Sequence, residues 1–227
     1  MTTSKISLPI RLVFILLLGI TPLLKAQKVY QFSTENKQGQ EEIHRIFVDD
    51  QYFIESVFIA SPATFISTKG GFYKKEENTY LVNFEFNSDF EKDGLKSHSY
   101  TERASWKLQK ETNQALKGKW LMGGRINEEG LSRRDTSGTR KTMKVLFNDY
   151  FQWIAFDTAS MKFSGTGGGK YLIDNGKYTE HIEYFSRDNS RVGAELSFDY
   201  EIINGEWHHK GLSSKGDPFH EIWIKRR

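Results

Sequence analysis

The chain has 227 residues, of which 37% are hydrophobic, 14% aromatic and 27% charged, and it contains no cysteine. The lack of cysteine excludes disulfides, thiolate metal sites and a cysteine nucleophile. The formal net charge of +3 arises from Lys5, Arg11 and Lys25 near the N-terminus. The rest of the chain is balanced in charge, which argues against a nucleic-acid partner.

Residues 1–26 are typical of a secretory signal peptide. Basic residues precede an apolar run from Leu12 to Ile20, and Leu24-Lys25-Ala26 resembles a cleavage site. The run ends at Thr21-Pro22, short of the roughly 18 to 20 apolar residues that a membrane-spanning helix needs. We therefore predict an exported protein, periplasmic or secreted, with no integral membrane segment after signal cleavage.

From Lys28 onward, short segments alternate between apolar and polar residues and are separated by clusters of Gly, Asn, Asp and Lys. This period of two, with many aromatic and β-branched residues, predicts half-buried strands joined by hairpin turns. In chain order the predicted strands are KVYQF, HRIFV, QYFIESVFI, TFIST, GFYKK, TYLVNFEF and SWKLQ, then GKWLMGG, TMKVLF, YFQWIAFD, MKFSG, GKYLID, KYTEHIEYF, ELSFDYEII, EWHHKG and FHEIWIKR. The predicted fold class is all-β and antiparallel.

The two halves of the chain resemble each other, which predicts an internal repeat. RIFVDDQYFI (Arg45–Ile54) matches KVLFNDYFQW (Lys144–Trp153), and YLVNFEFNS (Tyr80–Ser88) matches YTEHIEYFS (Tyr178–Ser186). The first half has no clear partner for the last strand, PFHEIWIKRR. We therefore predict a diverged, shortened N-terminal β repeat over residues 27–115 and a complete β-barrel repeat over residues 116–227.

The first strand of the second half contains Gly118-x-Trp120 and is followed by an irregular loop and successive hairpins, a pattern that resembles the lipocalin-like, or calycin-type, β-barrel. The series FQW, GGGKY, YTEHIEY and VG resembles a family of small exported bacterial lipocalin-like proteins of unknown function. This resemblance implies a barrel with an inner cavity, which in some members holds a ligand and in others carries out chemistry. The chain is also similar to oligosaccharide dehydratases that act on ulvan-type acidic sugars, which implies a lyase in carbohydrate degradation.

The segment YTEHIEYF concentrates tyrosine, histidine and carboxylate side chains in one predicted strand. Strand alternation places Tyr178, Glu180 and Tyr184 on one face and His181 on the other, and the sequence leaves open which face lines the barrel. In the first half, Val82 stands where the second half has Glu180. The alternative is that this strand has no functional role, with the tyrosines as core residues and His181 in contact with solvent.

The first functional hypothesis is a hydro-lyase that eliminates water from a terminal uronate of acidic oligosaccharides, sulfated ones included. The reaction needs a base for the proton alpha to the carboxylate, an acid for the departing hydroxyl and cationic groups for the developing charge. The predicted catalytic residues are His181, Tyr184, Tyr178 and Glu180. These residues cannot all act together if only one face of the strand points inward.

The alternative is a non-catalytic lipocalin-like protein that binds a sugar, lipid or other small ligand. The predicted binding residues are Trp153, Tyr171 and His208, together with Arg125 and Arg134 of a basic loop. Guanidinium groups match carboxylates and sulfates in geometry and charge, so this loop would act as a lid. Its other interpretation is an exposed connector.

His181-Ile-Glu183 has the same-face spacing of two metal ligands on a strand. A zinc site needs three or four ligands from separate strands, which the sequence does not specify. We predict no metal and no cofactor, with a divalent ion at His181 and Glu183 as the alternative. The glycine run Gly165–Gly169 lacks the spacing of a phosphate-binding loop and predicts a barrel corner. The expected partner is an anionic oligosaccharide or another small ligand.

Overall fold

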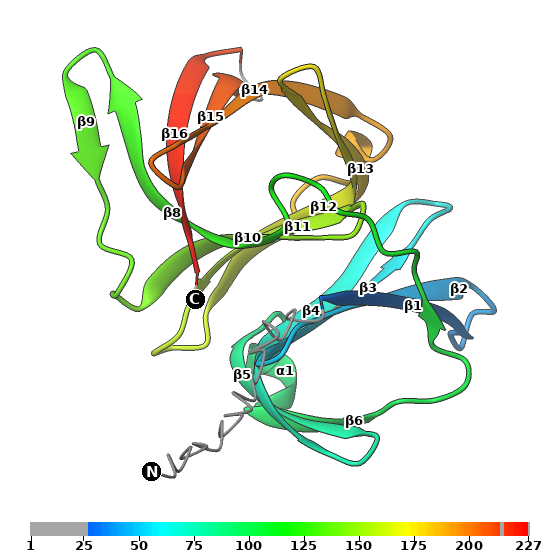
Figure 1. The fold of residues 1–227 in the computed structure, drawn as a ribbon. Coiled ribbons are helices and arrows are strands. Elements are labelled where there is room, and N and C mark those ends of the chain that lie inside the picture. Colours follow the sequence, from blue (N-terminus) through cyan, green and yellow to red (C-terminus); the bar gives the residue numbers. More distant parts are fainter. Residues whose placement is uncertain (1–26, 214–215, 227) are drawn as a thin grey trace, which may run out of the picture.

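The computed structural model describes residues 27–213 and 216–226, and strands form most of it (Figure 1). The first half forms an antiparallel sheet, here called the N-terminal sheet, with the strand order β6-β5-β4-β3-β2-β1-β7. Its strands are β1 (Lys28–Glu35), β2 (Glu41–Val48), β3 (Tyr52–Ile59), β4 (Thr64–Glu76), β5 (Thr79–Asn87), β6 (Ser97–Thr101) and β7 (Lys107–Leu108). A short helix, α1 (Phe90–Asp93), follows β5.

The second half forms a closed antiparallel barrel of eight strands. The strand order is β10-β11-β12-β13-β14-β15-β16-β8-β9, and β8 also pairs with β10, which closes the cylinder. The strands are β8 (Gly118–Asn127), β9 (Gly130–Arg133), β10 (Arg140–Phe147), β11 (Tyr150–Asp157), β12 (Phe163–Asp174), β13 (Lys177–Phe185), β14 (Glu195–Ile203), β15 (Glu206–Leu212) and β16 (Pro218–Lys225). Strand β9 pairs with β8 alone and projects from the barrel.

Local sequence accounts for the tight connections of the barrel. Asn175-Gly176 joins β12 to β13 and Asn204-Gly205 joins β14 to β15, and all four residues have positive φ. Two consecutive left-handed residues fit a type I′ hairpin turn, which matches the twist of the flanking strands. The all-β, antiparallel prediction is confirmed, and the barrel is consistent with a lipocalin-like one.

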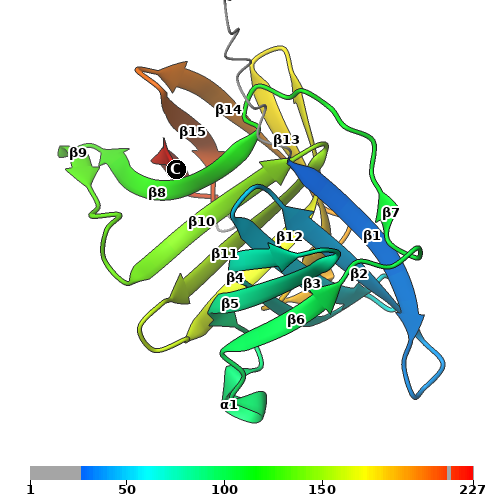
Figure 2. The ribbon, with the colours of Figure 1, turned by 60° about the horizontal axis from the view of Figure 1, so that its bottom comes forward.

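The N-terminal sheet and the barrel pack face to face and share a hydrophobic core. Figures 1 and 2 show the N-terminal sheet beside the β10–β12 side of the barrel. The buried residues of the shared core are Val29, Phe47, Tyr52, Ile54 and Phe86 from the sheet and Met143, Val145, Phe147, Ile154 and Phe156 from the barrel. Because this core is made by both parts, the free energy of burial couples them.

Buried polar contacts cross the same junction. The Gln152 side-chain nitrogen lies 3.0 Å from the hydroxyl oxygens of Thr68 and Thr166, and all three side chains are fully buried. Arg45 forms an ion pair of 2.6 Å with Glu183. Buried groups of this kind need partners, so the pairing fixes how the sheet sits on the barrel.

The two halves also share their irregularities. The pairing of β3 with β4 shifts between Val57 and Phe58, and that of β11 with β12 shifts between Ala155 and Phe156. A second shift follows at Gly70/Gly71 in β4 and at Gly168/Gly169 in β12. Equal spacing of two β-bulges supports the internal repeat, which stays a proposal.

Glycine is required at the second bulge. A Cβ atom on Gly169 would lie 1.9 Å from the carbonyl oxygen of His181, and one on Gly71 would lie 1.9 Å from that of Asn83. The glycine run is therefore a site of close strand approach within β12. The predicted signal peptide, residues 1–26, lies outside the described residues. In the part of the chain that the structure describes, no helix is long and apolar enough to cross a membrane.

Candidate functional site: the cationic mouth of the barrel

A cavity of about 700 Å³ opens at the end of the barrel where the β8–β9 hairpin projects. We call it the barrel mouth. Its charged lining residues are five basic side chains and one acidic side chain: Arg125, Arg133, Arg134, Lys144, Arg187 and Glu221. Trp153 and Trp223 supply aromatic surface. A concave site with aromatic walls and a few convergent polar groups is the usual form of a small-molecule site.

The five basic side chains of the mouth differ in how their charge is compensated. Arg133 grips Glu206 with two hydrogen bonds of 2.7 and 2.9 Å, and Arg125 donates to Glu221 at 3.2 Å. Arg134 instead donates to the Thr142 hydroxyl and the Arg140 carbonyl.

Arg187 donates to the carbonyl of Ser164, and its guanidinium lies 5.7 Å from the Trp153 ring centre. Among the described residues, the hydrogen-bond acceptors of Arg134 and Arg187 are thus neutral oxygens. Both guanidinium groups retain their full charge for a ligand.

Lys144, which lines the mouth, belongs to a buried ion pair in the barrel interior. The Lys144 ammonium lies 2.8 Å from Glu180, and the Tyr178 hydroxyl donates to the same carboxylate oxygen at 2.8 Å. The ammonium also lies 5.2 and 5.4 Å from the ring centres of Trp207 and Trp223. Burial, and secondarily the charge of Glu180, raise the pKa of Tyr178 well above its usual value. Tyr178 is therefore a neutral hydrogen-bond donor at physiological pH.

His209 lies beside this pair and is only 3% exposed. Burial, and secondarily the charge of Lys144, lower its pKa to about 4, so the imidazole is neutral at pH 7. Its Nδ1 atom is 3.7 Å from Glu221, and neither ring nitrogen has a hydrogen-bond partner among the described residues. The indole nitrogens of Trp207 and Trp223 are likewise unpartnered there. Of these three residues, Trp223 lines the mouth, whereas His209 and Trp207 are buried and are not among its lining residues.

The structure separates the four predicted catalytic residues. Tyr178 and Glu180 point into the barrel, whereas His181 lies outside, with a side chain that is 48% exposed. Tyr184 faces the N-terminal sheet, where its ring stacks on Phe58 at 4.8 Å. The expectation that Tyr184 shares a face with Tyr178 is wrong. The cause is the bulge at Gly168/Gly169, which shifts the pairing of β13 and reverses the alternation beyond it.

The predicted binding residues are also divided. Trp153, Arg125 and Arg134 all line the barrel mouth. Tyr171 is buried in the barrel core, away from the lining of the mouth. His208, another predicted binding residue, faces outward and pairs with His220 at 2.9 Å, while its neighbour His209 points inward.

Sequence reasoning missed Lys144, His209, Glu221 and Arg187. The sequence did contain a signal for Lys144. Residues two apart in a strand share a face, so Lys144, which lies between Met143 and Val145, shares its face with the apolar residue Leu146. For Arg187 and Glu221 no such signal exists, because only barrel closure brings the end of β13 and strand β16 to the same rim.

In the structure, both residues of the alternative metal site, His181 and Glu183, make other contacts. Glu183 is paired with Arg45, and His181 lies 3.9 Å from Glu195. Within residues 27–213 and 216–226, no group of three or more His, Asp or Glu side chains could hold a metal ion.

The sequence matches no protein-family model, and no curated protein is significantly similar to it. The class is therefore given by the fold: an all-β protein in which a closed eight-stranded antiparallel barrel, consistent with a lipocalin-like barrel, packs against a second sheet.

Proposed function

We propose that this protein binds an anionic small molecule at the barrel mouth, and that the ligand is an acidic oligosaccharide. The observation that carries the proposal is the pair of guanidinium groups, Arg134 and Arg187, whose acceptors are neutral oxygens, beside the tryptophan rings that line the mouth. Carboxylate or sulfate groups would accept the free N–H bonds of both arginines, and a sugar ring would stack on Trp153. Export through residues 1–26 is part of the same proposal.

A hydro-lyase acting on a terminal uronate is the second candidate, and the meeting of Lys144, Glu221 and His209 favours it. The Lys144 ammonium would stabilise the negative charge that develops alpha to the carboxylate, and the neutral imidazole of His209 would accept the proton. Tyr178 would protonate the departing hydroxyl, which leaves as water. In this candidate His181 and Tyr184 have no part, because they lie outside the barrel.

The binding proposal is tested by titrating the protein with saturated, uronate-ended oligosaccharides and with neutral oligosaccharides of the same length, by calorimetry. We expect the acidic series to bind and Arg134→Ala and Arg187→Ala each to raise its Kd about tenfold or more, since each removes charge-assisted hydrogen bonds. Arg103→Ala, on the N-terminal half, is the control and should leave Kd unchanged. Neutral oligosaccharides whose binding is weakened by Arg134→Ala and Arg187→Ala as strongly as that of the acidic series would contradict the proposal.

The two candidates are separated by following the absorbance of unsaturated uronate during incubation with the same acidic oligosaccharides. Product formation that is lost in His209→Gln but kept in His181→Ala supports the hydro-lyase. Saturable binding without any product supports a binding protein.

A further inference from the structure

The N-terminal sheet has a cavity of its own, about 380 Å³ in volume, on the face that points away from the barrel. We call it the N-terminal hollow and define it by Phe32, Glu55, Lys69, Tyr100 and Trp106, which all line it. It shares no lining residue with the barrel mouth. Any ligand it holds is therefore independent of the proposed function.

The floor of the N-terminal hollow is aromatic. Trp106 stacks on Phe32 with an interplanar angle of 5° and ring centres 5.7 Å apart, and the Phe32 ring continues onto His44 at 4.4 Å. These rings are parallel and stacked, so they cover part of each other's faces, and the remaining apolar surface of Phe32 and Trp106 lines the hollow, where the C–H groups of a sugar ring pack. Such packing removes apolar area from water without requiring a charge on the ligand.

The polar groups of the hollow are hydroxyls arranged around one fixed carboxylate. Glu55 lies 2.9 Å from His44. Burial raises the pKa of Tyr100, and the charge of Glu55 raises it further, so Glu55 and Tyr100 lie close together. Besides Tyr100, the hydroxyl-bearing residues of the lining are Ser33, Thr34, Ser67, Ser99, Thr101 and Ser105. Hydroxyls donate and accept hydrogen bonds, as the hydroxyls of a sugar do.

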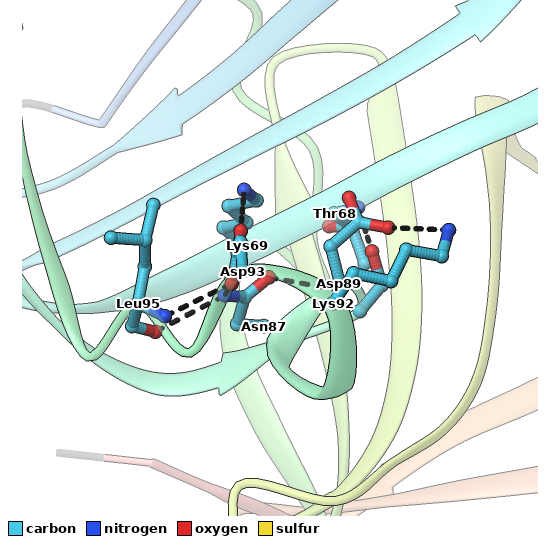
Figure 3. A network of polar contacts seen from close by, with 8 residues as sticks. Thr68, Lys69, Asn87, Asp89, Lys92, Asp93 and Leu95 are labelled. Atoms are coloured by element: carbon cyan, nitrogen blue, oxygen red, sulfur yellow. Dashed lines mark hydrogen bonds and ion pairs between the residues drawn. The ribbon is translucent and has the colours of Figure 1, made fainter.

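One wall of the hollow is held by the polar network around α1, shown in Figure 3. Asp93 accepts from Lys69 at 2.7 Å, from Asn87 at 2.8 Å and from the Leu95 backbone at 3.0 Å. Asn87 in turn donates to the Leu95 carbonyl. The wall is thus preorganised, and the charge of Lys69 is compensated before any ligand binds.

The charges of the hollow select against an anion. Lys69 is neutralised by Asp93, and Arg103 lies exposed at the rim, where water and salt screen it. Glu55, whose side chain is 15% exposed and lies beside His44, carries a negative charge into the lining and repels carboxylates and sulfates. We propose that the N-terminal hollow binds a neutral sugar ring, packed against Trp106 and hydrogen-bonded to Glu55 and the surrounding hydroxyls.

Saturation-transfer NMR on the full chain tests this site with a panel of neutral sugars: glucose, galactose, mannose, xylose, rhamnose, cellobiose and maltose. We expect transfer to the ring protons of at least one of them. Glu55→Gln, which preserves shape, should raise its Kd about tenfold, since a hydrogen bond to a charged acceptor is weakened. Trp106→Ala should abolish the transfer, and Trp106→Phe should retain part of it. Arg134→Ala, at the barrel mouth, should leave it unchanged.

The proposal is overturned if no sugar of the panel shows transfer, or if transfer persists in both Glu55→Gln and Trp106→Ala. Transfer that disappears in Arg134→Ala would also overturn it, by assigning the sugar to the barrel mouth. Because Glu55→Gln keeps the size of the side chain, it remains informative if Trp106→Ala fails to fold.

Discussion

The two halves differ at two matching interior positions. The pair Val48 and Phe53 in the N-terminal sheet corresponds to the pair Leu146 and Phe151 in the barrel. With this register, Ile46 occupies the position that Lys144 has in the barrel. On the next pair of strands, Val82 matches Glu180. Ile46 and Val82 are both fully buried in an apolar cluster, whereas Lys144 and Glu180 form a buried ion pair.

This difference separates what the hairpins need from what the barrel adds. The N-terminal sheet shows that the strand framework is stable with apolar residues at both positions. A buried ion pair contributes little net stability because desolvation offsets its attraction. The strand framework therefore does not require the charged pair in the barrel, which agrees with the ligand that we propose at the mouth.

The largest effect is expected when one charge of the buried pair between Lys144 and Glu180 is removed. Lys144→Met leaves Glu180 buried without its counter-ion, and we expect the free energy of unfolding to fall by about 3–5 kcal/mol. Urea denaturation measures this loss. Lys177→Met, which removes an exposed lysine from the same barrel, should change stability little.

The double variant Lys144→Ile with Glu180→Val gives the barrel the residues that the N-terminal sheet has at the matching positions, Ile46 and Val82. It should recover most of the lost stability, while binding at the mouth remains weakened. A double variant as unstable as Lys144→Met would show that the barrel depends on the ion pair for folding, against our interpretation.

The buried imidazole predicts a pH dependence that belongs to the barrel. The pKa of His209 is lowered to about 4 in the folded chain, so below its unfolded value of about 6.5 the unfolded state binds the extra proton. Stability from this residue is complete above pH 6.5 and declines as the pH falls toward 4, by about 3 kcal/mol in all.

Denaturation curves measured between pH 7 and about pH 4 test the imidazole prediction. His209→Phe should make stability less dependent on pH over this range, although Lys144, Glu180 and Glu221 still face the site. His181→Gln, on the outer face of β13, should keep the wild-type slope. Identical slopes for wild type and His209→Phe would contradict the prediction.

The smallest expected effect concerns the junction of the two parts. Gln152→Leu removes the hydrogen bonds to Thr68 and Thr166, and we expect a loss of about 1–2 kcal/mol. Thr179→Val, whose hydroxyl bonds Ser197 on the exposed face of β13, is the control and should change stability little.

Because the core is shared, Gln152→Leu should move one cooperative transition for the whole chain. Four of the five tryptophans lie in the barrel and Trp106 lies in the N-terminal half, so fluorescence of wild type and of Trp106→Phe reports on the parts separately. Two separate transitions, with one unaffected by Gln152→Leu, would show that the parts unfold independently.

The sequence supported the strands well and their faces poorly. Alternation located β13 and placed Tyr178 and Glu180 on one face, because that pattern is local. It failed at Tyr184, where a bulge reverses the alternation, and at His208, where only the barrel decides which of two neighbouring histidines is buried. The sequence comparison of the halves made Arg45 the counterpart of Lys144, whereas strand pairing makes Ile46 its counterpart. A shift of one residue in a strand exchanges its two faces, so the sequence comparison assigned the wrong face.

The sequence by itself determined the strands, their hairpins and the surplus of arginine in the segment after Trp120. Only the tertiary structure decided which face became the inside. Closure through the pairing of β8 with β10 and β16 gives every strand an inner face, and it joins Lys144 from β10, Glu180 from β13 and Glu221 from β16 in one site. No local pattern encodes that meeting, because the three residues come from strands that are far apart in the chain.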